Sequence, residues 1–465
     1  MNPQPRTTAI AGAFLWLFST ALFTFYERPI ESPRLTVHAS QVTMGDLKAV
    51  ARFWTEVTEK GTPLVESTGS DAGELRVTFL FRGGEETNNV VIMANNGLWG
   101  DIPSIRMERL AATDVWYRTY RFRADARFTY SLSVNDPLTP LTGIQDVGEW
   151  LKRSAGWQPD PLNPNRFPAY PRPLSVVELP GAPAQPWVVE KPGVPKGRIE
   201  VHKIKSAILA NERTVWVYTP AGYGKTTVPC GLLILFDGGA YSSWVPTPVI
   251  LDNLIFEGRI PPLVAAFIGH PSLPVRNSEL SCSLPFTRFL TAEFLPWLRR
   301  TYAVTEDPKL TVIGGSSNGG LGAAFAAFRH PEVFGNVLSQ SGAFMYNPAD
   351  DSEPEWLVRQ VTASRVLPIR FHLDCGLMET HPAAGDSPDI LTANRHMRDA
   401  LLTKGYWVHY QEFNGGHEYL NWRGTLAEGL IALLGGAFSR DTAPDGLGIS
   451  APVYFLRKPS GASHK

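Results

Sequence analysis

A glycine-rich segment of the chain contains the residue types that nucleophilic catalysis requires. Residues 311–324 have the sequence TVIGGSSNGGLGAA, an apolar run followed by a tight turn and then by small residues suited to a helix. Within it, residues 315–319 (GSSNG) match the G-x-S-x-G pattern, in which a strand-to-helix turn exposes a strained serine. We expect glycine at both outer positions because a side chain there would collide with neighbouring backbone. Ser316 is out of register with these glycines, so Ser317 is the predicted nucleophile.

A serine hydroxyl is a weak nucleophile until a base removes its proton, so we expect a histidine farther along the chain. His417 fits best because it follows the last expected strand, in FNGGHEY, where two glycines allow a loop to carry the imidazole over the sheet edge. His372 lies inside an expected strand, and His381 and His396 lack a comparable position. His417 is therefore the predicted general base.

The acid that orients this histidine is expected between Ser317 and His417, on the loop after a strand. The segment HLDCGLMETH offers Asp374 and Glu379. Asp374 ends the expected strand and has a structural role as its alternative, whereas Glu379 lies past Gly376 on the loop itself. We prefer Glu379, and a Ser–His dyad with no effective acid is the remaining alternative.

The oxyanion of an acyl-transfer intermediate needs two backbone N–H donors. The residue after the nucleophile, Asn318, supplies one of them in this arrangement. The second is expected from the loop FDGGAY, where Gly238 and Gly239 follow the strand LLILF and let the backbone approach the oxygen. The pattern leaves open which of Gly238, Gly239 and Ala240 donates, and an ordinary strand-to-helix turn is the alternative.

Positioning these groups at one edge requires a mostly parallel sheet flanked by helices. Residues 197–438 show the corresponding alternation of apolar strands and helical stretches, and we predict an α/β-hydrolase domain there. We expect an opening hairpin at 199–209 and 214–219, and buried strands at 232–236, 263–268, 310–314, 369–373 and 407–413.

The preceding residues predict a second folded unit. Residues 35–159 have helical spacing over 42–60 and then strand patterns at 75–82, 90–94, 116–122 and 128–133, which is typical of a β-sandwich. Residues 160–195 are crowded with proline and are expected to form a stiff linker laid across a surface, with a proline-rich ligand as the alternative. The polar segment 439–465 is expected to be a loosely held, flexible tail.

Composition excludes several classes of function. The chain of 465 residues has 43 Lys and Arg against 44 Asp and Glu, a net charge of −1, so nucleic acid is not expected as a partner. Three widely spaced cysteines and scattered histidines predict neither a disulfide scaffold nor a metal site. We expect no cofactor, and the sequence leaves the oligomeric state open.

Ordered motifs run through both units. They are TPLVE (62–66), VTFLFR (77–82), MERL (107–110), TDVW (113–116), DPLNP (160–164), VELP (177–180), Asp237-Gly238, RNSEL (276–280), LSQSG (338–342) and GGHEYLNWRG (415–424). Over about residues 61–436 the chain thereby resembles the enterochelin (enterobactin) esterase family. The resemblance implies a β-sandwich ahead of an α/β-hydrolase domain similar to esterase D and the mycolyltransferases. It also implies a serine esterase that hydrolyses the ester bonds of a catecholate siderophore, usually as the ferric complex, to release iron.

Carried onto this chain, the resemblance assigns the catalytic set to Ser317, His417 and Glu379. It also implies that Arg276 and Glu279, in the RNSEL motif, lie at the edge of the site, where Arg276 meets an anionic catecholate. An ion pair between Arg276 and Glu279 is the alternative. The expected partner is thus a small ester, and iron enters only as part of that substrate.

Two departures leave the substrate open. The family's elbow usually has the sequence GQSFG, whereas this one is GSSNG, which alters the wall beside the nucleophile. The family's two-domain members are typically cytoplasmic, whereas this chain begins with an apolar segment. One alternative is therefore an exported carboxylesterase that acts on feruloyl, polyphenolic or other acyl esters and has no role in iron. The other is a catalytically inactive protein that binds siderophores or glycans.

The N-terminal segment predicts export to the periplasm or the membrane. Residues 9–26 (AIAGAFLWLFSTALFTFY) carry no charge, follow Arg6 and end before Glu27, as in a signal peptide or a single membrane anchor. We expect residues 1–26 to direct export, with membrane contact through residues 9–26 if they are retained. A buried N-terminal helix of a cytoplasmic protein is the alternative, and a purely cytosolic, uncleaved product on immunoblots of fractionated cells would support it.

Overall fold

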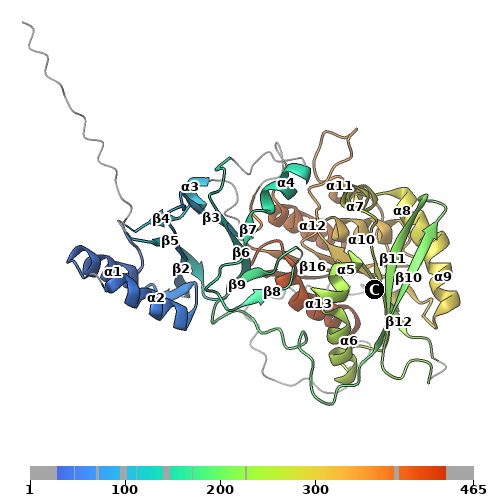
Figure 1. Ribbon diagram of the computed structural model, residues 1–465. Helices are drawn as coiled ribbons and strands as arrows, with labels where there is room; N and C mark the ends of the chain where they lie inside the picture. Colours follow the sequence, from blue (N-terminus) through green and yellow to red (C-terminus); the bar gives the residue numbers. More distant parts are fainter. Residues whose placement is uncertain are drawn as a thin grey trace, which may run out of the picture.

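The computed structural model describes residues 29–46, 48–69, 73–94, 102–110, 113–139, 147–169, 171–225, 228–381 and 387–435. These residues form a β-rich unit with helices at one end, followed by a larger domain built on one long sheet (Figure 1). The expected leader at 1–26 and tail at 439–465 lie outside the described residues. Within the described part of the chain, no helix is long and apolar enough to cross a membrane.

Two antiparallel sheets form the β-rich unit. One has the strand order β1-β2-β5-β4, and the other has the order β3-β6-β9-β8 with β7 paired to β6. Their facing side chains form one apolar core, in which the rings of Phe79 and Tyr130 lie 4.8 Å apart between centroids. Packing of the two sheets face to face confirms the predicted sandwich. The strands are β1 (Leu64–Ser67), β2 (Glu74–Arg82), β3 (Val90–Ala94), β4 (Glu108–Arg109), β5 (Val115–Arg123), β6 (Arg127–Val134), β7 (Trp157–Gln158), β8 (Arg166–Phe167) and β9 (Leu174–Glu178).

Two helices, α1 (Pro33–Thr43) and α2 (Ala49–Lys60), cover the outer face of the first sheet. The Ser32 hydroxyl begins α1 by accepting a hydrogen bond from the N–H of Leu35. The sequence predicts one helical stretch over residues 42–60. In the structure, α1 ends and α2 begins within this stretch, and Gly45, with φ 82°, lies in the turn between them. Two further short helices, α3 (Ile102–Ile105) and α4 (Val147–Ser154), lie in connections between strands.

The proline-rich segment 160–195 is a linker only in part. Strands β8 and β9 lie within it, and β9 pairs with β6 in the second sheet. The sequence analysis missed these strands because prolines flank them, yet the run LSVVEL between Pro173 and Pro180 contains no proline and keeps every N–H that a ladder needs. Residues 179–197 then connect the two units without a further strand.

An eight-stranded sheet forms the second domain, in the order β10-β11-β13-β12-β14-β15-β16-β17. The hairpin β10–β11 and the pair β11–β13 are antiparallel, and the remaining neighbours are parallel. The predicted class, an α/β hydrolase preceded by a β-sandwich, is confirmed, although the sequence analysis did not predict β15. The strands are β10 (Arg198–Ser206), β11 (Asn211–Thr219), β12 (Gly231–Phe236), β13 (Leu263–Ile268), β14 (Thr311–Ser316), β15 (Asn336–Gln340), β16 (Arg370–Gly376) and β17 (Trp407–Phe413).

Helices cover both faces of this sheet. Helices α5, α6 and α13 pack on one face, and α7 to α12 pack on the other. Their bounds are α5 (Gly238–Ser243), α6 (Thr247–Phe256), α7 (Leu273–Leu280), α8 (Leu284–Phe289), α9 (Leu295–Thr301), α10 (Asn318–Arg329), α11 (Trp356–Ala363), α12 (Ile390–Lys404) and α13 (Tyr419–Leu434).

The parallel strands carry the candidate site residues to one edge of the sheet. Strand β12 leads into Asp237, β14 into Ser317, β16 into the loop with Glu379, and β17 into the loop with His417. Because the carboxyl ends of parallel strands lie at the same edge, residues far apart in the sequence converge there.

Candidate active site

Ser317 lies on a sharp turn between β14 and α10. Its backbone has φ 58° and ψ −123°, a conformation that residues with a side chain rarely adopt. Three backbone hydrogen bonds hold it there. The Ser317 N–H donates to the carbonyl of Gln340 at 2.9 Å, and the Ser317 carbonyl accepts from the N–H of Ala343 at 3.0 Å and from that of Leu321 at 3.2 Å. The turn thus has the strained geometry of a nucleophile elbow, with the hydroxyl-bearing residue at the end of a central strand.

The glycines around the elbow have different roles. A Cβ on Gly315 would lie 3.0 Å from the Cα of Gly319, so a side chain there would be crowded, as expected. The same expectation is wrong for Gly319, whose nearest neighbours would be 3.7 Å away. The crowded partner is instead Gly320, where a Cβ would lie 2.3 Å from the Ser339 hydroxyl. Glycine is therefore required at Gly320, where α10 packs closely against β15, and not at Gly319 as the sequence predicts.

His417 and Glu379 form a short hydrogen bond, with 2.5 Å between His417 Nδ1 and Glu379 Oε2. The other carboxylate oxygen, Oε1, accepts from the Ser341 hydroxyl at 2.6 Å and from the Gly376 N–H at 2.8 Å. Ser341 in turn accepts from the Trp422 indole N–H at 3.0 Å. The carboxylate is buried and held in one orientation, so it fixes the imidazole with Nδ1 protonated and Nε2 free to take a proton.

Asp374, the competing acid, faces another histidine. Its carboxyl group is fully buried, 3.2 Å from the Nε2 of His372 and on the same strand. Burial raises the pKa of Asp374 well above its ordinary value, and the nearby Glu379 adds to the rise. Asp374 thus faces His372, and Glu379 is the carboxylate that contacts the His417 imidazole.

The loop after β12, where the second oxyanion donor is expected, makes a sharp turn into α5. Asp237 has φ 55°, and α5 begins directly after it at Gly238. A Cβ on Gly238 would lie 2.6 Å from the carbonyl oxygen of Phe267, so glycine is required at this position. The Ala240 N–H donates to the Asp237 carbonyl at 2.8 Å, which leaves Gly238 and Gly239 as the candidate donors.

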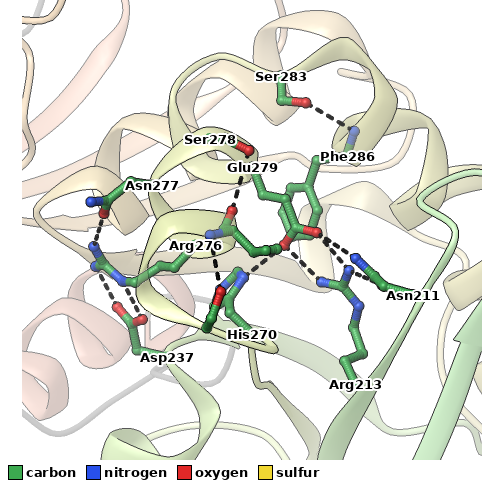
Figure 2. Close-up of polar contacts among 12 residues, drawn as sticks. Asn211, Arg213, Asp237, His270, Arg276, Asn277, Ser278, Glu279, Ser283 and Phe286 are labelled. Carbon is green, nitrogen blue, oxygen red and sulfur yellow. Dashed lines mark hydrogen bonds and ion pairs between the residues drawn. The ribbon is translucent and has the colours of Figure 1, made fainter.

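Arg276 and Glu279 point in opposite directions from α7 (Figure 2). The Arg276 guanidinium forms a two-pronged pair with the Asp237 carboxylate, at 2.5 Å for Nε–Oδ1 and 2.6 Å for Nη2–Oδ2. Its Nη2 also donates to the carbonyl of Ser316 at 3.3 Å. Arg276 therefore connects the turn before Gly238 to the strand end before Ser317.

Glu279 belongs to a separate buried network (Figure 2). It pairs with Arg213 at 2.7 Å and with the Nδ1 of His270 at 2.8 Å. Burial opposes ionisation of Glu279, but the hydrogen bonds from His270 and Arg213 outweigh it and hold its pKa at about 2. The alternative of an Arg276–Glu279 ion pair is wrong because each residue has another partner.

Among the described residues, no hydrogen bond joins the Ser317 hydroxyl to His417. Hydrogen bonds between a nucleophile and its base are often long without substrate and tighten in the Michaelis complex.

Three supporting residues of the site were not predicted from the sequence: Asp237, Ser341 and Trp422. Each lies in a recognised motif, but only the fold shows which side chain it contacts.

Comparison with known proteins gives a consistent set of relatives. A family model described as a putative esterase matches residues 206–433, and one described as the N-terminal part of enterochelin esterase matches residues 76–188. An iron(III) enterobactin esterase of Dickeya dadantii is 32% identical over 437 residues, covering 84% of this chain and 95% of the relative. An iron(III) salmochelin esterase of Escherichia coli O6:H1 is 27% identical, covering 85% and 96%.

Solved structures give the same result. The ferric enterobactin esterase of Salmonella typhimurium superposes with a TM-score of 0.69 at 26% identity, covering 82% of this chain and 98% of that one. The enterobactin esterase of Shigella flexneri, determined in the presence of enterobactin, superposes with a TM-score of 0.68 at 27% identity, covering 83% and 99%.

Substitutions of Glu379 and Asp374 should affect turnover very differently. Glu379→Gln removes the charge that faces His417 and should lower kcat for p-nitrophenyl butyrate by about 10²–10⁴-fold. Asp374→Asn changes a buried carboxyl group that contacts His372 rather than His417, so kcat should stay within about threefold of wild type. A large loss in Asp374→Asn with little loss in Glu379→Gln would reverse the assignment.

The Arg276 contacts predict an effect on turnover rather than on binding. Arg276→Gln removes the Asp237 pair, so the Gly238 turn should shift and kcat for p-nitrophenyl butyrate should fall by about tenfold or more, with KM nearly unchanged. Arg359→Gln, which removes a surface pair with Asp351, is the matched control and should leave both constants unchanged. A raised KM for ferric enterobactin alone would instead make Arg276 a substrate contact.

Proposed function

The chain belongs to the family of iron(III) enterobactin esterases, and from this premise we propose that it hydrolyses the ester bonds of a catecholate siderophore with Ser317 as its nucleophile. The observation that carries the proposal is the hydrogen bond between His417 and the buried carboxylate of Glu379. The bond lies at the same edge of the sheet as Ser317, whose backbone has a positive φ of 58°. This combination supplies a base with a fixed tautomer and a partly exposed nucleophile.

In the proposed reaction, the Ser317 Oγ attacks the ester carbonyl carbon while His417 Nε2 takes the hydroxyl proton. The carbonyl oxygen becomes an oxyanion, which accepts hydrogen bonds from the Asn318 N–H and from the Gly238 or Gly239 N–H. Collapse of the intermediate breaks the ester C–O bond, and His417 gives its proton to the departing alkoxide. Water then attacks the acyl-enzyme with the same base, releasing the acid and restoring Ser317.

Glu379 keeps its charge throughout this sequence. It stabilises the imidazolium that forms in each half-reaction, and Ser341 and the Gly376 N–H keep the carboxylate in position. Every step uses groups of this chain and the substrate. A ferric ion bound by catecholates enters as part of the substrate.

The relatives support an ester of the enterobactin type as substrate, since they are named as enterobactin and salmochelin esterases. Hydrolysis of such an ester leaves an alcohol and a carboxylic acid and needs no group transfer to a second substrate.

We expect purified protein to convert ferric enterobactin to linear trimer, dimer and monomer. Chromatography of samples taken over time measures these products. Ser317→Ala should abolish this turnover and leave the fold intact, because it removes a single hydroxyl from a partly exposed residue and so changes little of the packing. Methyl ferulate and p-nitrophenyl butyrate serve as comparison substrates. Ser317-dependent cleavage of these esters without cleavage of the siderophore would discard the iron role, and tight siderophore binding with no hydrolysis would favour a binding protein.

A further inference from the structure

Strand β6 of the sandwich has two buried faces of different chemistry. Its residues Phe128 and Tyr130 point into the apolar core between the sandwich sheets. The alternate positions Arg127, Thr129 and Ser131 are polar, yet none is more than 5% exposed. A row of polar side chains on a buried strand face requires polar partners, and part of this row finds them in the α/β domain.

Thr129 contacts the residue next to the predicted base. Its N–H donates to both carboxylate oxygens of Glu418, at 2.9 and 3.1 Å, and its hydroxyl donates to the same carboxylate. Glu418 is 5% exposed and lies 289 positions along the chain from Thr129. The carboxylate directly after His417 is thus held by a strand of the other domain.

Arg127 holds the loop on the other side of His417 through its backbone. Its N–H donates to the carbonyl of Asn414 at 3.0 Å, and its carbonyl accepts from the Asn421 side chain at 3.0 Å. The approach is so close that a Cβ on Gly415 would lie 2.6 Å from the Arg127 carbonyl oxygen. The first glycine of the GGHEY motif therefore makes room both for the Asn421 side chain, 2.2 Å from such a Cβ, and for the sandwich.

His417 is consequently held from two directions. Glu379, in its own domain, fixes the imidazole through Nδ1. Strand β6 of the sandwich holds the loop through the Asn414 carbonyl and the Glu418 carboxylate, and it holds the start of α13 through the Asn421 side chain. The orientation of an imidazole depends on both its hydrogen bond and its Cα position. A shift of about 1 Å at a catalytic group is enough to reduce turnover strongly.

We propose that the N-terminal sandwich is a positioning element for the catalytic base, and that Thr129 acts as its positioning residue through Glu418. This inference rests on the proposed function, in which His417 is the base. It assigns to the sandwich a role in the chemical step itself, separate from any contact that the sandwich makes with a large siderophore.

The proposal is tested with a small ester in place of the large siderophore. Thr129→Val keeps the shape and the backbone N–H but removes the hydroxyl donor, whereas Thr129→Ser keeps that donor. For p-nitrophenyl butyrate, Thr129→Val should lower kcat by about tenfold with KM within about twofold, and Thr129→Ser should restore most of the loss. Glu418→Gln, which keeps the side-chain shape and weakens the same contact, should lower kcat in the same way and provides a second variant if Thr129→Val does not fold.

Thr78→Val is the matched control. Thr78 is fully buried in β2 of the same sandwich, and its hydroxyl bonds to Thr119 rather than to the α/β domain. This variant should have wild-type kcat even if its thermal stability falls as much as that of Thr129→Val. Its hydroxyl hydrogen bond lies within the first sheet, so the variant reports on sandwich stability.

Three results overturn the proposal: wild-type kcat in folded Thr129→Val and Glu418→Gln, an equal loss of kcat in Thr78→Val, or a loss confined to KM for ferric enterobactin. Failure of the proposed function looks different, because wild-type turnover would then survive in Ser317→Ala.

Discussion

The left-handed conformation of Ser317 is the constraint on which the active site depends. A non-glycine residue in such a conformation costs about 1–3 kcal/mol, so the surrounding structure must hold it. Gln340 does this directly, since its carbonyl accepts from the Ser317 N–H and its side chain bonds to Tyr241, Trp422 and Thr425. One buried glutamine thus links the elbow to helices α5 and α13, and the position of the nucleophile is set by the same packing that closes one face of the sheet.

The base depends on a second set of contacts that crosses the two folded units. Glu379, Ser341 and Trp422 hold the imidazole from within the α/β domain, and β6 of the sandwich holds the loop from outside it. The elbow is rigid through its own strand and helix, whereas the His417 loop contains two glycines and gains its rigidity from its neighbours. This difference gives a physical reason for a hydrolase domain and a sandwich to occur in one chain.

The sequence predicts best those features that neighbouring residues in the chain decide. Ser317 and His417 were selected by glycine patterns beside strands, and Glu379 was preferred to Asp374 because it lies past the strand end, where the structure shows its bond to His417. Strand β15 was missed because NVLSQ has only two apolar residues, and its buried Asn336, Ser339 and Gln340 lack a strand pattern. The partners of Arg276 and of Glu418 were missed for another reason: Asp237 and Thr129 come near them only through the order of strands and the docking of the two units, which no local pattern encodes.

Trapping the nucleophile with a fluorophosphonate tests the central claim most directly. Treated protein is digested and the modified peptide located by mass spectrometry, and the rate of modification is compared in wild type and His417→Ala. The account predicts a single label on Ser317, at a rate that falls by about a hundredfold or more without the imidazole, because the hydroxyl then has no base. A label on Ser316 or Ser341, or an unchanged rate in His417→Ala, would contradict it.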